Sequence, residues 1–509
     1  MKKNQANAGL KEDRGKAQWR HFLFGLALVI YALATFNTML AHEPWRDEAY
    51  AWLIARDADL VEFFRLRAYD WSPGLWYLIL MPFAKLAFPY LTMSIIHWLL
   101  AVAVVAFILW RSPFSPLTKL LLVFSYYLFW EYVISVRVYA VSILLLVILA
   151  QLYPERFKRP IAYAALIALL FSANMHVSGM AAALSAAYVL EAVRLRYFSR
   201  PIILGGILMG LGALALFLQV GIQPADCVRG ETQGWSFNAS RIYQALVGAF
   251  FVGVGPVNLL VPAGIVMFAL IFWGLATRPM PCLIFLGHTA FLLYVFAKTG
   301  GGVRHHGLLL IGTMFCLWIA GSPSRPGSGF PRAGPEASWR WLESLARKLP
   351  DNEARWRAAA AALNFVLLVS LPAGVMMHNL EHKHDYSGGK AMAGFITANH
   401  LEQYPIAAHR DAAQISLLPY LPGKQLWYAT IGAYGTYYRQ NQQRYQAFFA
   451  MTYADALQKI EQAFPAGSPL LILLDAPLPP GHEQKYRLIH KVDSTVFGSD
   501  ERFYLYARF

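Results

Sequence analysis

Long uninterrupted blocks of apolar residues constrain this sequence more than any other feature. A helix needs about 17 to 25 mostly apolar residues to cross the hydrocarbon core of a bilayer. Eleven blocks come close to this length and are predicted to cross: 21–40, 93–110, 117–131, 134–152, 161–176, 178–193, 201–221, 257–276, 281–297, 307–320 and 358–377. The sequence therefore predicts an all-α polytopic membrane protein with about eleven transmembrane helices.

The composition agrees with this class and argues against others. Charged residues make up 14% of the chain, whereas an ordinary soluble domain has about 25%. Lys and Arg outnumber Asp and Glu by 44 to 29, but no basic module with interleaved aromatic residues is present, so nucleic acid is not an expected partner. The three cysteines cannot form a disulfide framework, and no CxxC or Cys/His spacing predicts a zinc site.

The positive residues predict the orientation of the chain, because Lys and Arg are concentrated in cytoplasmic loops. They gather in the N-terminal segment 1–20 and in the loops 156–159, 194–200 and 321–356, which are all predicted to be cytoplasmic. The block 21–40 then reads as an uncleaved signal anchor. The expected location is the cytoplasmic membrane of a bacterium, with the N-terminus inside.

The same charge pattern places the first loop, 41–92, and the tail, 378–509, on the outer face. Two further apolar stretches should then not cross the membrane. We predict that 73–90 is a helix at the outer interface and that 242–256 is a surface or re-entrant helix. The membrane-embedded catalytic domain would occupy 21–377.

The tail 378–509 is more polar and is predicted to be a small extracytoplasmic α/β domain with the C-terminus outside. Leu470–Leu474, just before Asp475, is a strand candidate, and a second apolar stretch covers 414–420 after Asp411. A short apolar run bounded by turn-forming residues is typical of a buried strand.

Acidic residues stand at the outer ends of predicted helices. Asp47 and Glu48 follow the first helix in the run His42-Glu-Pro-Trp-Arg-Asp-Glu-Ala-Tyr50, and Glu131 ends a hydrophobic hairpin just before Arg137. Ionisable groups at membrane depth are costly unless they are paired or face a wet cavity, so they are functional candidates. Structural explanations stay open: Asp47 and Glu48 suit the start of a helix, and Glu131 and Arg137 could form an ion pair.

Basic residues and glycines form a second group on the outer side. The segment 298–306 reads Lys-Thr-Gly-Gly-Gly-Val-Arg-His-His, and its basic residues are Lys298, Arg304, His305 and His306. Exposed N–H groups, a guanidinium fork and imidazoles all suit phosphate. His176, in Ser172-Ala-Asn-Met-His-Val-Ser178, is a further candidate ligand or proton carrier. A flexible turn with interfacial basic residues and a polar interface histidine are the simpler alternatives.

With these motifs in this order, the sequence resembles the GT-C integral membrane glycosyltransferases. The likeness is to the protein O-mannosyltransferase, lipid A aminoarabinose transferase and rhizobial galacturonosyltransferase group, and it covers about residues 20–310. Its carriers are Trp45-Arg-Asp-Glu-Ala49, Ser72-Pro-Gly-Leu-Trp-Tyr77, Glu131 with Arg137 and Tyr139, the Asn174–His176 region, and Arg304-His-His306.

The resemblance implies a polyprenyl-phosphate-linked sugar as donor and a hydroxyl of a glycolipid, polysaccharide or protein as acceptor. The acid of the first outer loop is a base or metal ligand in such enzymes, which falls here on Asp47 with Glu48 beside it, and Glu131 would be the second acid. Related sequences often have His-Pro near 72–74, where this chain has Ser-Pro-Gly. The residues then expected to bind lipid phosphate and sugar are Arg137, Tyr139, His176, Lys298, Arg304, His305 and His306.

We therefore expect a membrane glycosyltransferase with a lipid-linked donor. The alternative is a lipid-linked glycan transporter or a non-catalytic envelope assembly factor, although the internal repeats typical of transporters are not evident. A phosphoethanolamine-type transferase is a third hypothesis, because the tail carries candidate metal ligands, namely His378, His382, His384 and Asp385. Mg or Mn is a candidate cofactor, since the carboxylates of Asp47 and Glu131 are hard oxygen ligands.

Overall fold

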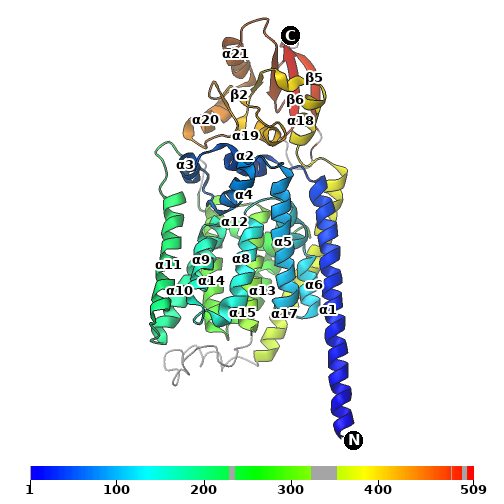
Figure 1. Cartoon of the computed structure of the whole chain (residues 1–509), viewed down its shortest axis with the longest axis vertical. Helices are drawn as coiled ribbons and strands as arrows, with labels where there is room; N and C mark the ends of the chain where they lie inside the picture. The colour runs from blue at the N-terminus through cyan, green and yellow to red at the C-terminus, as the bar shows by residue number, and fades with distance from the viewer. Residues whose placement is uncertain are drawn as a thin grey trace.

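A bundle of helices carries a small sheet domain on one end, and the two chain ends lie at opposite ends of the molecule (Figure 1). The computed structural model describes residues 2–228, 236–322, 352–482, 484–493, 495 and 501–508. Most of the loop predicted over 321–356 lies outside these described residues. We call the end of the bundle that carries the sheet the sheet-domain end.

The helices of the bundle coincide with the eleven predicted blocks. In the described part of the chain, eight helices are long and apolar enough to cross a membrane: α1 (Lys2–Ala41), α5 (Leu91–Arg111), α10 (Ser178–Arg194), α11 (Arg200–Leu216), α13 (Val257–Leu275), α14 (Pro279–Thr299), α15 (Val303–Gly321) and α17 (Asn352–Lys383). A pair bent by 50°, formed by α6 (Pro116–Val123) with η1 (Tyr127–Glu131) and α7 (Tyr132–Ile134), is either a broken ninth span or a re-entrant loop. Two shorter apolar helices run beside them, α8 (Tyr139–Leu152) and α9 (Pro160–Phe171) (Figure 1).

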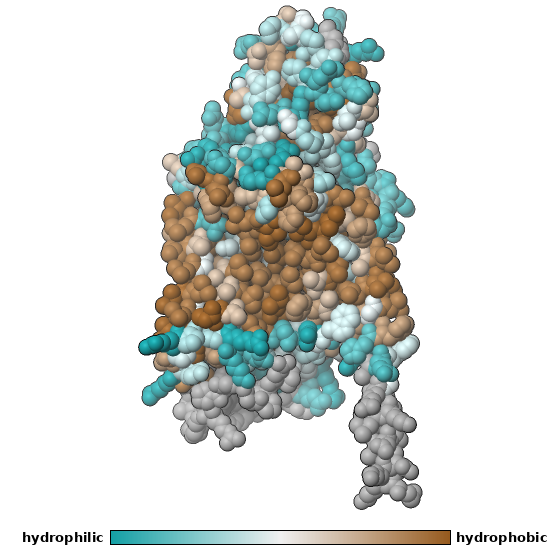
Figure 2. Space-filling view, viewed as in Figure 1, coloured by the Kyte–Doolittle hydropathy of each residue, from teal (hydrophilic) through white to brown (hydrophobic). Residues whose placement is uncertain are grey.

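The surface of the bundle matches a bilayer. It is apolar across the middle and hydrophilic toward both ends (Figure 2). Leu33 of α1, Leu211 of α11 and Leu259 of α13 are each more than half exposed. Contiguous apolar surface of this extent is unfavourable in water, and hydrocarbon covers it in a membrane. The fold is therefore that of a multi-pass membrane protein.

Close packing in the bundle uses small residues, as is usual for membrane helices. A Cβ atom at Gly212 of α11 would lie 2.6 Å from the Cα atom of Ala168 in α9. A Cβ atom at Gly274 of α13 would lie 2.5 Å from the Cβ atom of Ala359 in α17. Larger side chains at these two positions would push the helix pairs apart.

The first loop folds at the sheet-domain end as three short helices, α2 (Arg46–Asp57), α3 (Leu60–Asp70) and α4 (Leu75–Lys85). At the start of α4, the N–H of Leu75 donates to the carbonyl of Ser172 (3.0 Å). At its end, the Lys85 ammonium donates to the carbonyl of Ala58 (2.8 Å). Both partners lie at the sheet-domain end, so this stretch does not cross the bundle, as predicted for 73–90.

The second ambiguous stretch, predicted over 242–256, forms α12 (Ala239–Phe250). Just before it, the N–H of Asn238 donates to the carbonyl of Ala297 near the end of α14 (2.8 Å). Just after it, Gly253 lies against Ala373, in the half of α17 nearer the sheet domain. The helix therefore enters and leaves from one side, as a re-entrant helix does.

The sheet domain has six strands in the order β3-β2-β1-β4-β6-β5. They are β1 (Ile406–Ala408), β2 (Leu426–Tyr428), β3 (Ala433–Gly435), β4 (Leu470–Leu474), β5 (Arg487–Val492) and β6 (Phe503–Arg508). β1 pairs in parallel with β2 and β4, and the other pairs are antiparallel. The predicted strand is β4, whereas the second apolar stretch folds as the 3₁₀ helix η6 (Ile415–Tyr420).

The two faces of the sheet pack against different partners, because alternate residues of a strand point to opposite faces. Leu471 and Leu473 of β4 share a hydrophobic core with α2, in which 48–55 are buried. Leu470 and Leu474 pack instead with Leu457 of α21 (Tyr453–Ala463). The first loop and the sheet domain thus share one core, which fixes α2 between the sheet and the bundle.

Candidate active site at the junction of bundle and sheet domain

Asp47 lies in the first turn of α2 and forms an ion pair with the guanidinium group of Arg137. Its side chain is 36% exposed, so the carboxylate remains open to solvent. Burial by itself would raise the pKa of Asp47, but the guanidinium groups of Arg137, Arg304 and Arg46 outweigh it and hold the pKa below the ordinary value. Asp47 is therefore ionised at neutral pH.

Glu131 pairs with Arg304 rather than with Arg137. Its Oε1 atom lies 3.7 Å from Nε of Arg304, and Tyr126 donates its hydroxyl to Oε2 (2.9 Å). The ion pair between Glu131 and Arg137 considered from the sequence does not form, because Arg137 turns toward Asp47. The guanidinium carbon of Arg304 lies 4.8 Å from the ring centroid of Trp45.

Two acid–base pairs thus meet at the junction, and each comes from a different part of the chain. Asp47 stands on the first loop, Arg137 on the turn between α7 and α8, Glu131 at the end of the π-helix η1, and Arg304 in the first turn of α15. π-helical turns inside membrane helices are often found at functional sites. Here the turn η1 ends at Glu131, one of the candidate acids.

Glu48 is fully buried and faces away from the solvent that reaches Asp47. Its carboxylate accepts the N–H groups of Trp45 (2.8 Å) and Val136, and Oε2 lies 3.2 Å from Nε2 of His42. The bond to Val136 ties α2 to the turn that carries Arg137. The sequence predicts Glu48 beside Asp47 among the catalytic residues; the structure places its carboxylate behind Asp47, against His42 and two backbone N–H groups.

His42 links Glu48 to the end of the bundle. Its Nδ1 atom lies 2.9 Å from Oε2 of Glu381 in α17, and Trp130 donates its indole N–H to Oε1 of the same carboxylate (3.2 Å). Burial lowers the pKa of His42, but Glu381 and Glu48 raise it more, so the pKa lies well above the ordinary value. We call His42, Glu48 and Glu381 the buried triad; it joins α1, α2 and α17.

The glycine-rich segment before α15 forms a tight turn. Gly300 and Gly301 have φ values of 81° and 72°, which favour glycine. The ring of His306 bonds to the carbonyl of Gly300 (3.0 Å), and the N–H of Gly302 donates to Nδ1 of His305 (2.9 Å). These bonds hold the turn that begins α15, and so they aim Arg304 at the acids.

The remaining predicted residues separate into two groups. His176 stacks on His305 with ring centroids 4.4 Å apart, and Tyr139 approaches the other side of His305 at 6.3 Å. Lys298 contributes its carbonyl, which accepts from Arg241 (2.6 Å); its ammonium group has no hydrogen-bond or ion-pair partner within the described residues. The structure thus places His176, His305 and Tyr139 close to Arg137 and Arg304, whereas the Lys298 side chain is not part of this group.

Several residues of the site had no clear sequence signal. Arg67 and Asp70 form a buried ion pair (3.0 Å), and Tyr77 donates to Asp70 (3.2 Å). The i, i+3 spacing of Arg67 and Asp70 on a helix is the only sequence hint. Gly74, in the Ser-Pro-Gly motif, donates its N–H to Gln219 (2.9 Å), and a Cβ there would meet the ring of Phe63 at 2.7 Å.

The candidate metal ligands do not come together. Throughout the described ranges, no group of three or more His, Cys, Asp or Glu side chains is placed to hold a metal ion. Guanidinium groups occupy the positions beside Asp47 and Glu131 that a cation would need. His378 and His382 instead bond to Thr38 of α1 (2.6 and 3.3 Å). The residues of the site therefore do not fit Mg or Mn, and this cofactor stays an untested prediction.

Asp47 also borders a cavity of about 460 Å³ that it shares with the sheet domain. The Asp47 carboxylate is thus paired with Arg137, lies within the electrostatic influence of Arg304, and borders a cavity. Such an arrangement can accept a proton from a bound hydroxyl while cations stabilise negative charge that develops beside it.

No protein-family model matches the chain, and no curated protein is similar to it in sequence. Among solved structures, ArnT from Cupriavidus metallidurans bound to undecaprenyl phosphate is similar in fold. The TM-score is 0.50 and the sequence identity 12%, and the match covers 95% of this chain and 97% of that chain. The chain therefore has the GT-C-like fold that its motifs implied. At this identity, the match concerns the architecture alone.

Proposed function

We propose that this GT-C-like membrane protein is a glycosyltransferase that moves a sugar from a polyprenyl-phosphate donor to an acceptor hydroxyl. The observation that carries the proposal is the place of Asp47, beside the guanidinium groups of Arg137 and Arg304 and at the border of a cavity. The ArnT structure, which contains undecaprenyl phosphate, supports a donor of this class through its shared fold.

In the proposed reaction, Asp47 accepts the proton of the acceptor hydroxyl as that oxygen attacks the anomeric carbon. The bond between this carbon and the phosphate oxygen breaks, and its electron pair leaves with the lipid phosphate. The proton passes from Asp47 to solvent through the exposed part of its carboxylate. A single displacement of this kind inverts the anomeric configuration.

Arg137 and Arg304 would bind the lipid phosphate and stabilise the charge that it gains on leaving. Guanidinium groups present forked donors that match phosphate oxygens. Arg304 is held loosely by Glu131, at 3.7 Å, and rests on the ring of Trp45. A phosphate can therefore take over donors of Arg304, while Glu131 keeps its position. In this role, Glu131 is a positioning residue for Arg304.

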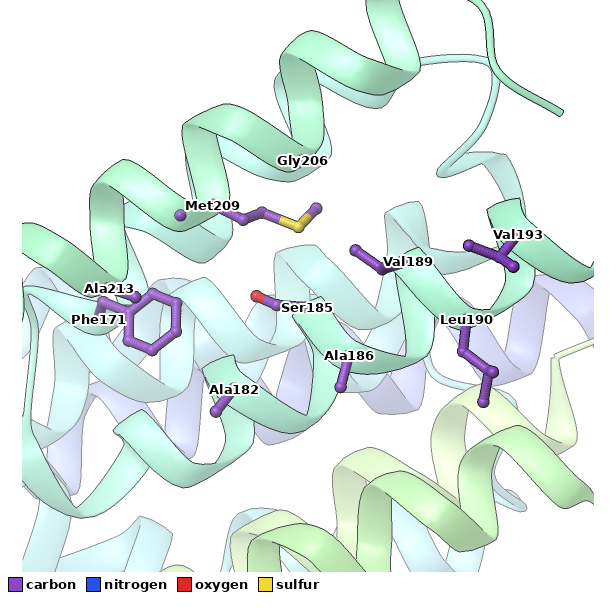
Figure 3. A pocket seen from close by; sticks show the side chains of 11 residues that line it. Phe171, Ala182, Ser185, Ala186, Val189, Leu190, Val193, Gly206, Met209 and Ala213 are labelled. Atoms are coloured by element: carbon purple, nitrogen blue, oxygen red, sulfur yellow. The ribbon is translucent and has the colours of Figure 1, made fainter.

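An apolar groove in the membrane zone suits the isoprenoid chain of such a donor. It has a volume of about 640 Å³ and runs between α10 and α11, as Figure 3 shows. Phe171, Ala182, Val189 and Met209 line it, and Ser185 is the only residue with a polar side chain among those that do. An apolar chain gains the most free energy against such a lining.

We place the protein in the inner membrane of a bacterium, with 1–20 in the cytoplasm and 378–509 outside. The basic residues of the loops 156–159 and 194–200 support this orientation, because they lie at the bundle end opposite the sheet domain (Figure 1). The transfer would then take place on the outer face, within the membrane domain 21–377 and beneath the sheet domain.

The test is mass spectrometry of envelope glycolipids, polysaccharides and glycoproteins from a deletion strain complemented with wild type, Asp47→Asn or Asp57→Asn. Asp57 is the matched control, because it ends the same helix and, among the described residues, pairs only with its neighbour Arg56. We expect a sugar that is missing in the deletion to return with wild type and Asp57→Asn, but not with Asp47→Asn. Full rescue by Asp47→Asn at equal protein level would instead favour the transporter or assembly factor.

A further inference from the structure

The cavity beside Asp47 is built mainly by the sheet domain, and we propose that it binds the acceptor as a sugar that carries a phosphate or carboxylate group. This inference deepens the proposed function and rests on it, because the sugar hydroxyl would meet Asp47. It concerns a binding site, however, and binding is measurable without transfer.

The fold places the cavity at a usual ligand position. In open sheets, ligands bind outside the carboxyl ends of parallel strands. Asp411 follows β1 and Thr430 follows β2, which are parallel neighbours, and both residues line the cavity. The opposite wall is the first turn of α2, with Arg46 and Asp47. The carboxyl ends of the strands and the proposed base therefore face one space.

Polar groups at the strand ends are fixed in advance. Thr430 donates its hydroxyl to the carboxylate of Asp411, whose two oxygens lie 2.6 and 2.7 Å away. Nε of Arg444 lies 2.9 Å from the same carboxylate. The Nη2 atom of Arg444 is buried and has no hydrogen-bond partner among the described residues. A buried donor without a partner is costly, and an oxygen of a bound anion would satisfy it.

An aromatic wall closes the cavity on the side of α20 (Gln442–Ala450), a helix in which no residue is fully buried. Tyr445, Phe448 and Phe449 line the cavity from this helix, and Phe449 is 69% exposed. Their rings lie 4.9 to 5.0 Å from one another along the helix. Exposed aromatic side chains gathered on one face indicate a binding surface, and ring faces pack well on the apolar faces of sugars.

The charges of the cavity favour an anion. Its charged lining residues are Arg46, Arg439, Arg444, Asp47 and Asp411. Arg439 pairs with Glu62 outside the lining (2.8 Å), and Arg444 pairs with Asp411 within it (2.9 Å). Asp47 is already paired with a guanidinium group outside this lining, Arg137. The formal charge of the lining is thus positive, and the buried Nη2 atom of Arg444 is the donor that an oxygen of a phosphate or carboxylate group would satisfy.

The size of the cavity also limits the occupant. About 460 Å³ falls in the range of small-molecule sites, which is roughly 300–1,000 Å³. One or two sugar rings fill such a space. An extended peptide would need a longer groove or a free strand edge, so we favour a saccharide over a protein acceptor.

The experiment measures binding to the purified full-length protein in nanodiscs by calorimetry. The probes are glucose 6-phosphate, glucuronate, glucose, inorganic phosphate and a short Ser/Thr peptide. We expect the two anionic sugars to bind at least tenfold more tightly than glucose or phosphate alone, and the peptide not to bind. Equal binding of glucose and the anionic sugars, or binding of the peptide only, would overturn the proposal.

Variants locate the site. Arg444→Gln should weaken the binding of anionic sugars at least tenfold, and Phe449→Ala should weaken it severalfold. Phe449 is exposed, so its loss leaves folding intact even if Arg444→Gln does not fold. Tyr434→Ala is the matched control, since Tyr434 is a half-exposed aromatic residue on β3 outside the cavity lining. Unchanged binding in Phe449→Ala and in a folded Arg444→Gln would place the sugar elsewhere.

Asp47→Asn separates the two proposals. This variant should still bind glucose 6-phosphate, because the anion contacts Arg444 and the sugar contacts α20. Binding together with unimpaired transfer in Asp47→Asn would refute the assignment of the base and leave the sugar site standing. Transfer that depends on Asp47 without selective binding of anionic sugars would refute the sugar site alone.

Discussion

Asp47 and Glu48 are neighbours in one helical turn, yet they lie in regions with opposite properties. The Asp47 carboxylate is partly exposed, faces a cavity and has one direct partner, Arg137. The Glu48 carboxylate is fully buried and has three partners, the backbone of Trp45 and Val136 and the ring of His42. A carboxylate that can exchange protons needs solvent and a substrate, whereas a saturated buried carboxylate holds its neighbours in place.

The comparison shows that two neighbouring acids can have different roles, one structural and one in contact with substrate. The buried triad fixes the position of α2 and of the turn that carries Arg137. Asp47, Arg137 and Arg304, which we call the exposed cluster, are then left free to contact substrate. Mutations in the two regions should therefore differ in what they remove: protein stability in the first, transfer in the second.

The largest effect is expected for Glu48→Gln. This change removes one of the two carboxylates that pair with the charged ring of His42, and it weakens the bonds to the N–H groups of Trp45 and Val136. Breaking a buried ion pair lowers the free energy of unfolding by about 3–5 kcal/mol. We expect a lower melting temperature in nanodiscs and less protein in the membrane. Glu62→Gln, in the half-exposed pairs of α3 with Arg65 and Arg439, is the control. If Glu48→Gln keeps the wild-type melting temperature, the buried region is not the one that stabilises the fold, and the contrast between the two regions is wrong.

Arg304→Ala tests the exposed cluster. Removing one donor that stabilises a developing negative charge typically lowers the rate about 10²–10³-fold. We expect a loss of this size in transfer per folded protein, measured by glycan mass spectrometry in cells or by product formation with purified protein. Lys298→Ala, whose ammonium group has no partner among the described residues, should change transfer far less. Similar losses in both variants would mean that the positive charge of the segment matters, and not its geometry.

The third prediction concerns pH and the joint between α2 and the sheet. Glu501 is buried, accepts the N–H of Arg46 (2.9 Å) and the hydroxyl of Ser387 (2.6 Å), and burial raises its pKa to about 7. Below about pH 4.5 the carboxyl group is protonated in both the folded and the unfolded state. As the pH rises from about 4.5 to about 7, it ionises in the unfolded state but stays protonated in the folded state, so the protein loses stability over this range. The shift corresponds to about 3 kcal/mol. We expect Glu501→Gln to flatten the decline of melting temperature between pH 5 and 7; an unchanged slope would contradict the raised pKa.

The smallest effect is expected for His176→Ala. His176 contributes a ring stack on His305 (4.4 Å), and such contacts are worth about 0.5–1.5 kcal/mol. The aim of Arg304 should loosen slightly, and transfer should fall by about tenfold or less. His176→Phe keeps the stack and should restore most of the activity. If His176→Phe is as inactive as His176→Ala, the imidazole takes part in the chemistry.

The sequence predicted the membrane architecture well, because apolar length and the position of Lys and Arg are local properties of the chain. The apolar helices of the bundle, the non-crossing stretch at 73–90 and the strand Leu470–Leu474 all follow from such patterns, although only eight or nine of the eleven predicted spans are long enough to cross by themselves in the described part of the chain. It also found Asp47, Glu131 and Arg304 as candidates, since ionisable residues at the ends of apolar blocks are rare. It did not find Asp411, Thr430 or Arg444, which stand among many polar residues of the tail and have no pattern of their own.

The sequence by itself thus determined where the apolar helices of the bundle lie and which charged residues stand at their ends. Only the tertiary structure decided that Arg137 pairs with Asp47 and Arg304 with Glu131, and that Glu48 is buried behind them. It also decided that the strand ends of the sheet domain face α2 across a cavity. The physical reason is the distance along the chain over which each property is set. Hydropathy and charge patterns are local, whereas pairing and solvent access depend on residues that are 90 or more positions apart, as Asp47 and Arg137 are. Such residues meet only when the chain has folded and the shared core of α2 and the sheet has formed.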